Sequence, residues 1–318
     1  MKKKKETAYL RNTMFLETAG GTIHYKRFGE GPRFLIALHG YGENAAHFET
    51  LGALLGEEYS LLCPDLPLHG QTNWHSALDP SSFLDLIDQI CQQEARTQGN
   101  ETGGKGNQPG ANENLATAIG KQAGTIEKQP GAVKKLTVLG YSMGARLWLS
   151  AYRQHPEKFE QLILVAPDGL IVNPWYWFAT QTRVGKGVFR RTMANPAWFF
   201  KATQWAKKIK LLNESVFKFT HRFLDDPRQR QELYERWTFF RSFRSVPSET
   251  AQLVKNRQTP VLLLLGKYDR IITAANGKRW QAKAGPSCRL EILPAGHRLL
   301  QGPSAEAIAA SILQNLRS

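Results

Sequence analysis

The sequence predicts an α/β fold in which helices cover both faces of a mostly parallel, twisted sheet, and three observations support this. Short apolar segments alternate with amphipathic helical segments along the chain, as in right-handed βαβ units. Several apolar segments end in glycine-rich turns, the position at which open α/β sheets form their sites. One of these segments, residues 136–139, runs into a Gly-x-Ser-x-Gly pattern at residues 140–144 and then into a helix.

The first elements form one edge of this sheet and its first crossover. Residues 14–18 and 22–28 flank Gly20 and Gly21, which permit the positive φ angles of a tight hairpin turn. Residues 33–38 form a continuous apolar strand that runs into the His-Gly-Tyr-Gly turn at 39–42. A helix is expected over 43–56, a strand over 60–63, and a helix over 81–95 that an Asp-Pro pair opens. The apolar face of the first helix comprises Phe48, Leu51, Leu54 and Leu55.

Residues 97–131 break the alternation. They are rich in Gly, Asn, Gln and Thr and have almost no large apolar side chain before Leu115, so they cannot bury enough surface to offset the entropy of ordering. We predict a disordered surface insertion with a short helix near 114–120; a partner-binding loop is the alternative.

The second half of the chain resumes the alternation after one long interval. A strand is expected at 161–166, but the next convincing strand is at 261–265, and the interval between them is aromatic and basic. A connection of this length forms a subdomain, which we predict to be a helical cap over residues 169–250. A helix at 273–284, a strand at 288–293 and a helix at 303–317 follow. The core then comprises residues 14–168 and 251–318, with residues 1–13 as a basic tail.

Three polar residues follow the expected strands in an order that suggests nucleophilic catalysis. Ser142 lies in the tight turn between a strand and a helix, which lifts a hydroxyl above the sheet edge. A serine needs a base to take its proton and a third group to orient that base. Asp269 follows the strand at 261–265 and His297 follows the strand at 288–293, so both are expected at the same sheet edge. Asp168 also follows a strand and is the alternative acid.

These motifs resemble the α/β-hydrolase superfamily, specifically its lid-bearing, esterase-like members. The resemblance covers nearly the whole chain except residues 97–131 and the details of the cap; it rests on residues 39–42, 65–70, 140–144, 266–272 and 296–297 in family order. It implies that Ser142 is the nucleophile, His297 the general base and Asp269 the orienting acid. It also implies that the backbone N–H groups of Tyr41 and Met143 form the oxyanion hole, and that no metal or organic cofactor is required.

Other residues near these motifs are expected to support the site. Asp65 and His69 are expected to brace loops, and the His39 ring to hold the oxyanion turn by hydrogen bonds. Leu68 and Ala145 occupy positions where relatives often have glycine.

Arg146, one helical turn after Ser142, is where two enzymatic interpretations differ. It either contacts an anionic substrate group or pairs with a carboxylate on a solvated face, and we favour the second. Residues 141–146 also resemble the elbow of the menaquinone-pathway lyase of the superfamily, in which an arginine at this offset contacts a carboxylated substrate. Trp175 and Trp177 in the cap are further candidates for substrate binding.

The composition limits partners and location. The net charge of +15 attracts anionic partners, but no zinc-finger spacing or RNA-binding aromatic motif accompanies it, so we expect no specific nucleic-acid binding. At most, a weak peripheral association with an anionic membrane is expected. Three cysteines cannot all pair, which indicates a reducing cytoplasm. The lysine-rich N-terminus precedes a polar stretch rather than the apolar region of a signal peptide.

The sequence thus predicts a serine hydrolase that cleaves a carboxylic ester or related small acyl compound through an acyl-enzyme. One alternative is a C–C bond lyase or hydrolase that uses the same residues on a carboxylated substrate. The other is a non-catalytic ligand-binding or membrane-surface protein on a hydrolase scaffold.

Overall fold

The computed structural model describes residues 13–102, 135–208 and 224–315. Its sheet has nine strands: β1 (Thr13–Thr18), β2 (Gly21–Phe28), β3 (Arg33–Leu38), β4 (Tyr59–Pro64), β5 (Asn73–Trp74), β6 (Leu136–Tyr141), β7 (Phe159–Val165), β8 (Val261–Gly266) and β9 (Cys288–Leu293). The order is β1-β2-β4-β3-β6-β7-β8-β9, with β5 paired to β2. All pairs from β4 to β9 are parallel, whereas β2 runs antiparallel to β1, β4 and β5.

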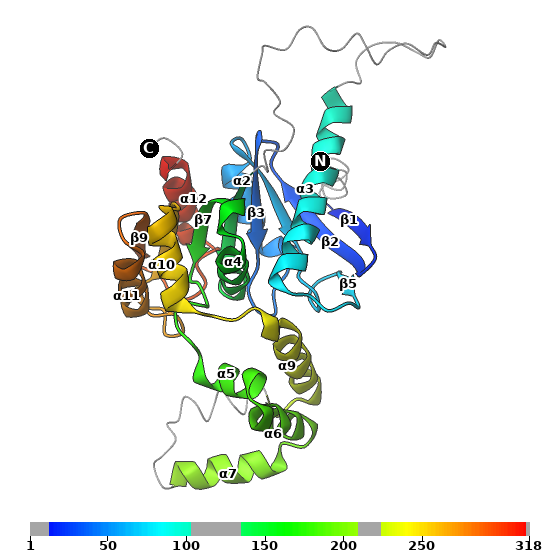
Figure 1. Ribbon diagram of the computed structural model, residues 1–318, viewed down its shortest axis with the longest axis vertical. Coiled ribbons are helices and arrows are strands. Elements are labelled where there is room, and N and C mark those ends of the chain that lie inside the picture. Colours follow the sequence, from blue (N-terminus) through cyan, green and yellow to red (C-terminus); the bar gives the residue numbers. More distant parts are fainter. Residues whose placement is uncertain (1–12, 103–134, 209–223, 316–318) are drawn as a thin grey trace.

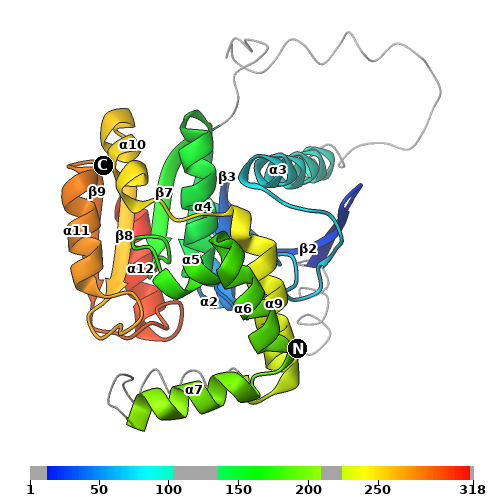
Figure 2. The ribbon, with the colours of Figure 1, turned by 60° about the horizontal axis from the view of Figure 1, so that its bottom comes forward.

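Helices pack on both faces of this sheet (Figures 1 and 2). The face that carries Ile36 and Leu38 of β3 is covered by α3 (Pro80–Thr102), α4 (Met143–Gln154), α10 (Pro247–Arg257) and α11 (Ala274–Ala284). The face that carries Leu35 and Ala37 is covered by α2 (Glu49–Leu55) and α12 (Pro303–Asn315). Successive residues of β3 therefore enter opposite cores, which explains why this strand is apolar throughout.

A group of helices between β7 and β8 lies apart from the sheet (Figures 1 and 2). It contains α5 (Pro174–Gln181), α6 (Arg183–Ala194), α7 (Ala197–Lys208) and α9 (Pro227–Phe239), and the 3₁₀ turn η3 (Phe240–Ser242) ends it. Aromatic side chains hold these helices together: the Trp237 ring lies 5.1 Å from the Tyr176 ring and 5.4 Å from the Phe189 ring. Two further 3₁₀ turns lie outside this group of helices: η1 (Ala45–Phe48), in which Ala45 and Phe48 are buried, and η2 (Pro156–Lys158), which has no buried residue.

The structure confirms the predicted α/β fold and its largely parallel sheet. The expected helix over 43–56 is instead η1 followed by α2. Leu54, assigned to its buried face, is 42% exposed, because the buried residues of α2 are Leu51, Gly52 and Leu55 and Leu54 lies to one side of them. α3 extends to Thr102, so residues 97–102, predicted to begin a disordered insertion, are helical. The rest of the predicted insertion, its short helix and residues 1–12 lie outside the described residues.

Two further observations concern the chain as a whole. Cys63 and Cys288 are buried as small apolar side chains. Among the described residues, no helix has both the length and the apolar character that crossing a membrane requires.

Candidate active site

The turn between β6 and α4 holds Ser142 in a strained backbone conformation. Its φ of 49° and ψ of −114° lie in a region that residues other than glycine rarely adopt. The flanking glycines make the turn possible: a Cβ atom on Gly140 would lie 2.4 Å from the Ala145 Cα, and one on Gly144 would lie 2.2 Å from the Leu38 carbonyl oxygen. The Gly-x-Ser-x-Gly pattern is therefore a packing requirement of this turn.

The structure brings together the three residues that the strand order had placed at one edge. The Nε2 atom of His297 lies 3.2 Å from the Ser142 Oγ atom, and its Nδ1 atom lies 2.7 Å from Oδ2 of Asp269. The other carboxylate oxygen of Asp269 accepts hydrogen bonds from the backbone N–H groups of Ile271 (2.8 Å) and Ile272 (2.9 Å).

The environment of Asp269 keeps it ionised. Burial raises the pKa of this carboxyl, but the hydrogen bonds from His297, Ile272 and Ile271 lower it more, so that the pKa lies below its usual value. An ionised Asp269 accepts a hydrogen bond from the Nδ1–H group of His297, which leaves Nε2 of His297 free to accept the hydroxyl proton of Ser142.

Contacts between neighbouring loops fix the position of His297. The loops after β8 and β9 touch: Tyr268 donates its backbone N–H to the Ala295 carbonyl at 2.9 Å, and a Cβ atom on Gly266 would lie 2.3 Å from the Gly296 carbonyl oxygen. The hydroxyl of Tyr141 donates to the carbonyl of His297 at 3.1 Å. Tyr141, the residue immediately before Ser142, therefore holds the backbone of His297.

The turn that carries Tyr41 is held from both ends. The Gly40 N–H group donates to the Glu43 carboxylate at 3.0 Å, and the Glu43 N–H group donates to the Gly40 carbonyl at 3.3 Å. The His39 ring lies between two backbone groups: Nδ1 donates to the Gly40 carbonyl (2.8 Å) and Nε2 accepts from the Leu66 N–H (3.0 Å). Burial lowers the pKa of His39 to about 4, which keeps the ring neutral so that Nε2 can accept.

Met143 supplies the second N–H group that the resemblance implies. It is the first residue of α4, so its N–H lies in the first turn of the helix, where intrahelical acceptors are absent. The positive end of the helix dipole lies at the same point. An anion beside Ser142 would therefore meet a backbone donor there.

A buried carboxylate braces the next loop, as the sequence suggests. Asp65 accepts hydrogen bonds from the N–H groups of Ala45 (2.6 Å) and Gln71 (2.8 Å), and one of its oxygens lies 2.6 Å from Nδ1 of His24. Burial raises its pKa, yet these hydrogen bonds bring it below the usual value. In the same loop, the φ of Leu68 is 64°, a conformation that favours glycine. The buried His69 ring packs 5.1 Å from the His39 ring.

Arg146 and Asp168 pair with each other beside the elbow. The Nη1 atom of Arg146 lies 3.2 Å from Oδ2 of Asp168, and the guanidinium lies 4.3 Å from the centre of the Tyr176 ring. Asp168 therefore contacts Arg146 rather than His297. Pairing with a carboxylate agrees with the favoured interpretation, but the expected solvated face is wrong, because Arg146 is only 6% exposed. The elbow turns α4 so that this position faces the helices between β7 and β8.

The two predicted substrate-binding tryptophans differ from this pattern. Trp175 is 68% exposed and Trp177 is 52% exposed, whereas Tyr176 between them is buried and contacts Arg146. Substrate binding by Trp175 and Trp177 stays a prediction.

Sequence reasoning missed two residues that contact the site. Arg236 of α9 donates from Nε to the Leu68 carbonyl at 3.2 Å, and its guanidinium lies 5.2 Å from the Tyr41 ring centre. Tyr141 is the other, through its contact with His297. No spacing in the sequence indicates Arg236, whereas the position of Tyr141 next to Ser142 is a signal that the sequence contains.

No metal centre accompanies these residues in the part of the chain that the structure describes: it contains no group of three or more His, Cys, Asp and Glu side chains arranged to hold an ion. The chemistry available at this edge is that of a serine hydroxyl, an imidazole, a carboxylate and backbone donors.

Comparison with known proteins agrees with the fold. The family model described as "Alpha/beta hydrolase family" matches residues 35–311. An uncharacterized hydrolase of Bacillus subtilis, YugF, is 24% identical over 281 residues, which cover 87% of this chain and 88% of that protein. An esterase from Thermogutta terrifontis has a TM-score of 0.58 at 16% identity, over 96% of this chain and 98% of its own. A meta-cleavage product hydrolase from Pseudomonas fluorescens has a TM-score of 0.57 at 14% identity, over 97% and 98%.

Proposed function

Because this chain belongs to the alpha/beta hydrolase family, we propose that it is a serine hydrolase that cleaves a carboxylic ester or related acyl compound through an acyl-enzyme intermediate. One observation carries the proposal: the continuous contact from Ser142 through His297 to Asp269, with separations of 3.2 Å and 2.7 Å. This is the arrangement in which a histidine activates a serine hydroxyl while a carboxylate holds the histidine in the required tautomer.

The proposed reaction proceeds in two halves. In the first, the Ser142 oxygen bonds to the carbonyl carbon while Nε2 of His297 takes the hydroxyl proton; the tetrahedral intermediate then expels the alcohol, which receives that proton. In the second, water gives a proton to His297 as its oxygen attacks the acyl carbon, and Ser142 regains the proton as the acid leaves. Asp269 stays ionised and stabilises the imidazolium in both halves.

The oxyanion of each intermediate is assigned to the N–H groups of Tyr41 and Met143. One such donor typically stabilises the transition state by about 2.7–4 kcal/mol. The hydrogen bonds of Gly40 with Glu43 and of His39 with Leu66 support this assignment, because they fix the turn that carries Tyr41 before substrate binds.

The helices α5, α6, α7 and α9 lie in the proposed cap, residues 169–250. Two contacts support this role: Arg236 reaches the Tyr41 turn, and Tyr176 packs against Arg146 beside the elbow. A cap in this position would exclude water from the acyl-enzyme and shape the acyl pocket.

The contact of Arg146 with Asp168 favours ester hydrolysis over the C–C alternative. In the alternative, Arg146 binds a substrate carboxylate, but here a carboxylate of the chain already pairs with it. The fold does not separate the two reactions, since an esterase and a meta-cleavage product hydrolase both share it. Rates with p-nitrophenyl esters and with carboxylated diketones would separate them: a lyase would turn over the simple esters poorly.

Labelling with a fluorophosphonate probe tests the nucleophile. We expect the protein to be labelled, Ser142→Ala to remove both labelling and p-nitrophenyl ester hydrolysis, and circular dichroism to show a folded variant. Ser81→Ala is the matched control, because the Ser81 hydroxyl also contacts a histidine, with 2.9 Å to Nε2 of His155, but lies at the start of α3. Labelling that persists in Ser142→Ala would exclude the proposed mechanism.

A further inference from the structure

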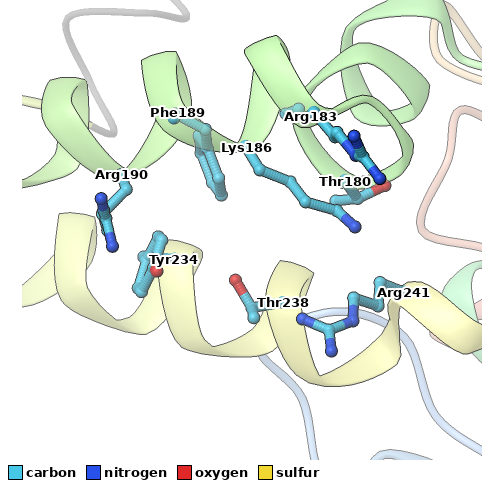
Figure 3. A pocket seen from close by; sticks show the side chains of 10 residues that line it. Thr180, Arg183, Lys186, Phe189, Arg190, Tyr234, Thr238 and Arg241 are labelled. Carbon is cyan, nitrogen blue, oxygen red and sulfur yellow. The ribbon is translucent and has the colours of Figure 1, made fainter.

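A cavity of about 310 Å³ lies among the helices of the proposed cap, and its charged lining residues are all cationic. α5 and α6 form one side, while α9 and η3 form the other (Figure 3). Its lining includes four cationic side chains, Arg183, Lys186, Arg190 and Arg241, together with the hydroxyl-bearing Tyr234 and Thr238. We call it the cationic cavity. None of the site residues around Ser142 lines it.

Within the described residues, no acidic side chain neutralises these four cations. None of them takes part in an ion pair there, and no carboxylate lines the cavity. The acidic residues of α9 make other contacts: Glu232 pairs with Arg236 at 3.2 Å, and Glu235 accepts from Gln231. In the described part of the chain, therefore, no carboxylate pairs with the cations that line the cavity.

The helix geometry concentrates this charge. Arg183, Lys186 and Arg190 are spaced three and four residues apart, which places them on one face of α6, where like charges destabilise a helix. Tyr234, Thr238 and Arg241 have the spacing that places them opposite on α9 and η3. Figure 3 shows Lys186 and Thr238 extending into the space between the two helices. Arg191 is exposed, as the lining cations are, but it lies outside the lining.

From this arrangement we propose that the cationic cavity binds the phosphate group of a small organic phosphate or diphosphate, at a site separate from Ser142. A phosphate presents several strong acceptor oxygens, which match guanidinium forks, an ammonium group and hydroxyl donors converging from two sides. The volume lies at the lower end of the range for small-molecule sites, which suits a compact anion. Bound anion would also remove the repulsion along α6.

Thermal melting of the full chain with pyrophosphate tests the proposal. We expect the melting temperature to rise saturably with pyrophosphate and to stay unchanged with sodium chloride of equal ionic strength. Lys186→Gln and Arg190→Gln should each weaken pyrophosphate binding about tenfold or more, measured by calorimetry, since each removes a charge-assisted contact. Arg191→Gln, which removes the same charge from the same helix outside the cavity, should bind as the unmodified protein does.

The behaviour without ligand separates a binding role from a structural one. If the cations of the cavity repel one another, Lys186→Gln melts at a higher temperature than the unmodified protein in the absence of phosphate. Its melting temperature then rises less when pyrophosphate is added. Equal responses of Lys186→Gln and Arg191→Gln, or a chloride effect as large as that of pyrophosphate, would overturn the proposal. Sedimentation with phosphatidylcholine vesicles, prepared with and without phosphatidate, shows whether the bound phosphate belongs to a lipid or to a soluble compound. If the protein cosediments with phosphatidate vesicles and pyrophosphate abolishes this, the cavity binds a lipid phosphate. If the protein does not cosediment, the cavity binds a soluble phosphate.

Discussion

Tyr141 shows how one side chain next to the proposed nucleophile serves the whole site. Its hydroxyl donates to the carbonyl of His297, and its ring lies 5.6 Å from the His297 ring and 5.4 Å from the His47 ring. The side chain is buried at the end of β6, where the elbow begins. Tyr141 thus connects the elbow to the loop that carries the proposed base, which makes it a positioning residue.

Tyr141→Phe tests this role. The ring stays, but the bond to the His297 backbone is lost, and we expect kcat for a p-nitrophenyl ester to fall about fivefold, because one net hydrogen bond is worth about 1 kcal/mol. KM and the pH profile should stay unchanged. Tyr152→Phe is the matched control: its hydroxyl is buried against Thr259 at 2.7 Å, so its loss should lower stability without lowering kcat. Equal falls in kcat for both variants would indicate a general loss of packing.

The residues of the site were predictable to different degrees. Ser142 and His297 follow strands with local glycine signals, so their positions could be inferred without knowing the packing. Asp168 and Asp269 both follow parallel strands, and only the structure shows that Arg146 contacts one while His297 contacts the other. Arg236 reaches the site from α9 across many residues of chain, and no local pattern specifies such a contact.

At the scale of the element, α6 contains two glycines with opposite surroundings. A Cβ atom on Gly185 would lie 1.9 Å from the Phe178 carbonyl oxygen, so α6 packs closely against α5 there. A Cβ atom on Gly187 would meet nothing within 4 Å in the described structure. The sequence gives no reason to treat Gly185 and Gly187 differently, since both lie inside one helix two residues apart.

Alanine substitution at these positions should change stability in opposite directions. Gly187→Ala should raise the free energy of unfolding by about 0.8–1 kcal/mol, the helix-propensity difference between the two residues. Gly185→Ala should lower it, because the helices must separate to admit the methyl group. Urea denaturation of each variant measures both effects. A stabilised Gly185→Ala variant would contradict the close packing of α5 and α6.

At the scale of the whole molecule, buried histidines make stability depend on pH. Burial lowers the pKa of His39 to about 4 and that of His69 to about 3, from ordinary values of 6.5. Between these values the unfolded chain binds protons that the folded chain does not, so the folded state loses stability as the pH falls below about 6.5. Each histidine should contribute up to about 1.4 kcal/mol per pH unit in this interval.

Denaturant titrations between pH 7 and pH 4.5 check this prediction. The free energy of unfolding should fall steadily as the pH is lowered, and His69→Gln should reduce the slope. His69 suits the test because its Nε2 atom is buried without a hydrogen-bond partner in the described structure, whereas both ring nitrogens of His39 hold backbone groups. His75→Gln, at an exposed position, serves as the control with an unchanged slope. A slope independent of His69 would contradict its burial as a neutral ring.

The overall architecture was more predictable than the packing of its helices. β3 coincides with the predicted segment because a strand buried on both faces is apolar over almost its whole length. β9, at the end of the strand order, also coincides with its predicted segment, although Arg289 and Glu291 interrupt its apolar residues. The helices α5, α6, α7 and α9 contain many aromatic residues, so the sequence alone permits more than one assignment of their buried faces. In α5 the structure buries Tyr176 against Arg146 and leaves Trp175 and Trp177 exposed. The two-residue strand β5 has no periodicity from which it could be predicted.

α9 carries contacts to two distant places on one rigid element. Tyr234 and Thr238 line the cationic cavity. Arg236, between them in the sequence, donates a hydrogen bond to the Leu68 carbonyl, and its guanidinium lies over the Tyr41 ring. Any shift of this helix acts on both places at once. If an anion in the cationic cavity changes the affinity of an acyl ligand that binds beside Tyr41 by some factor, thermodynamic linkage requires a reciprocal effect. The acyl ligand must change the affinity of the anion for the cavity by the same factor.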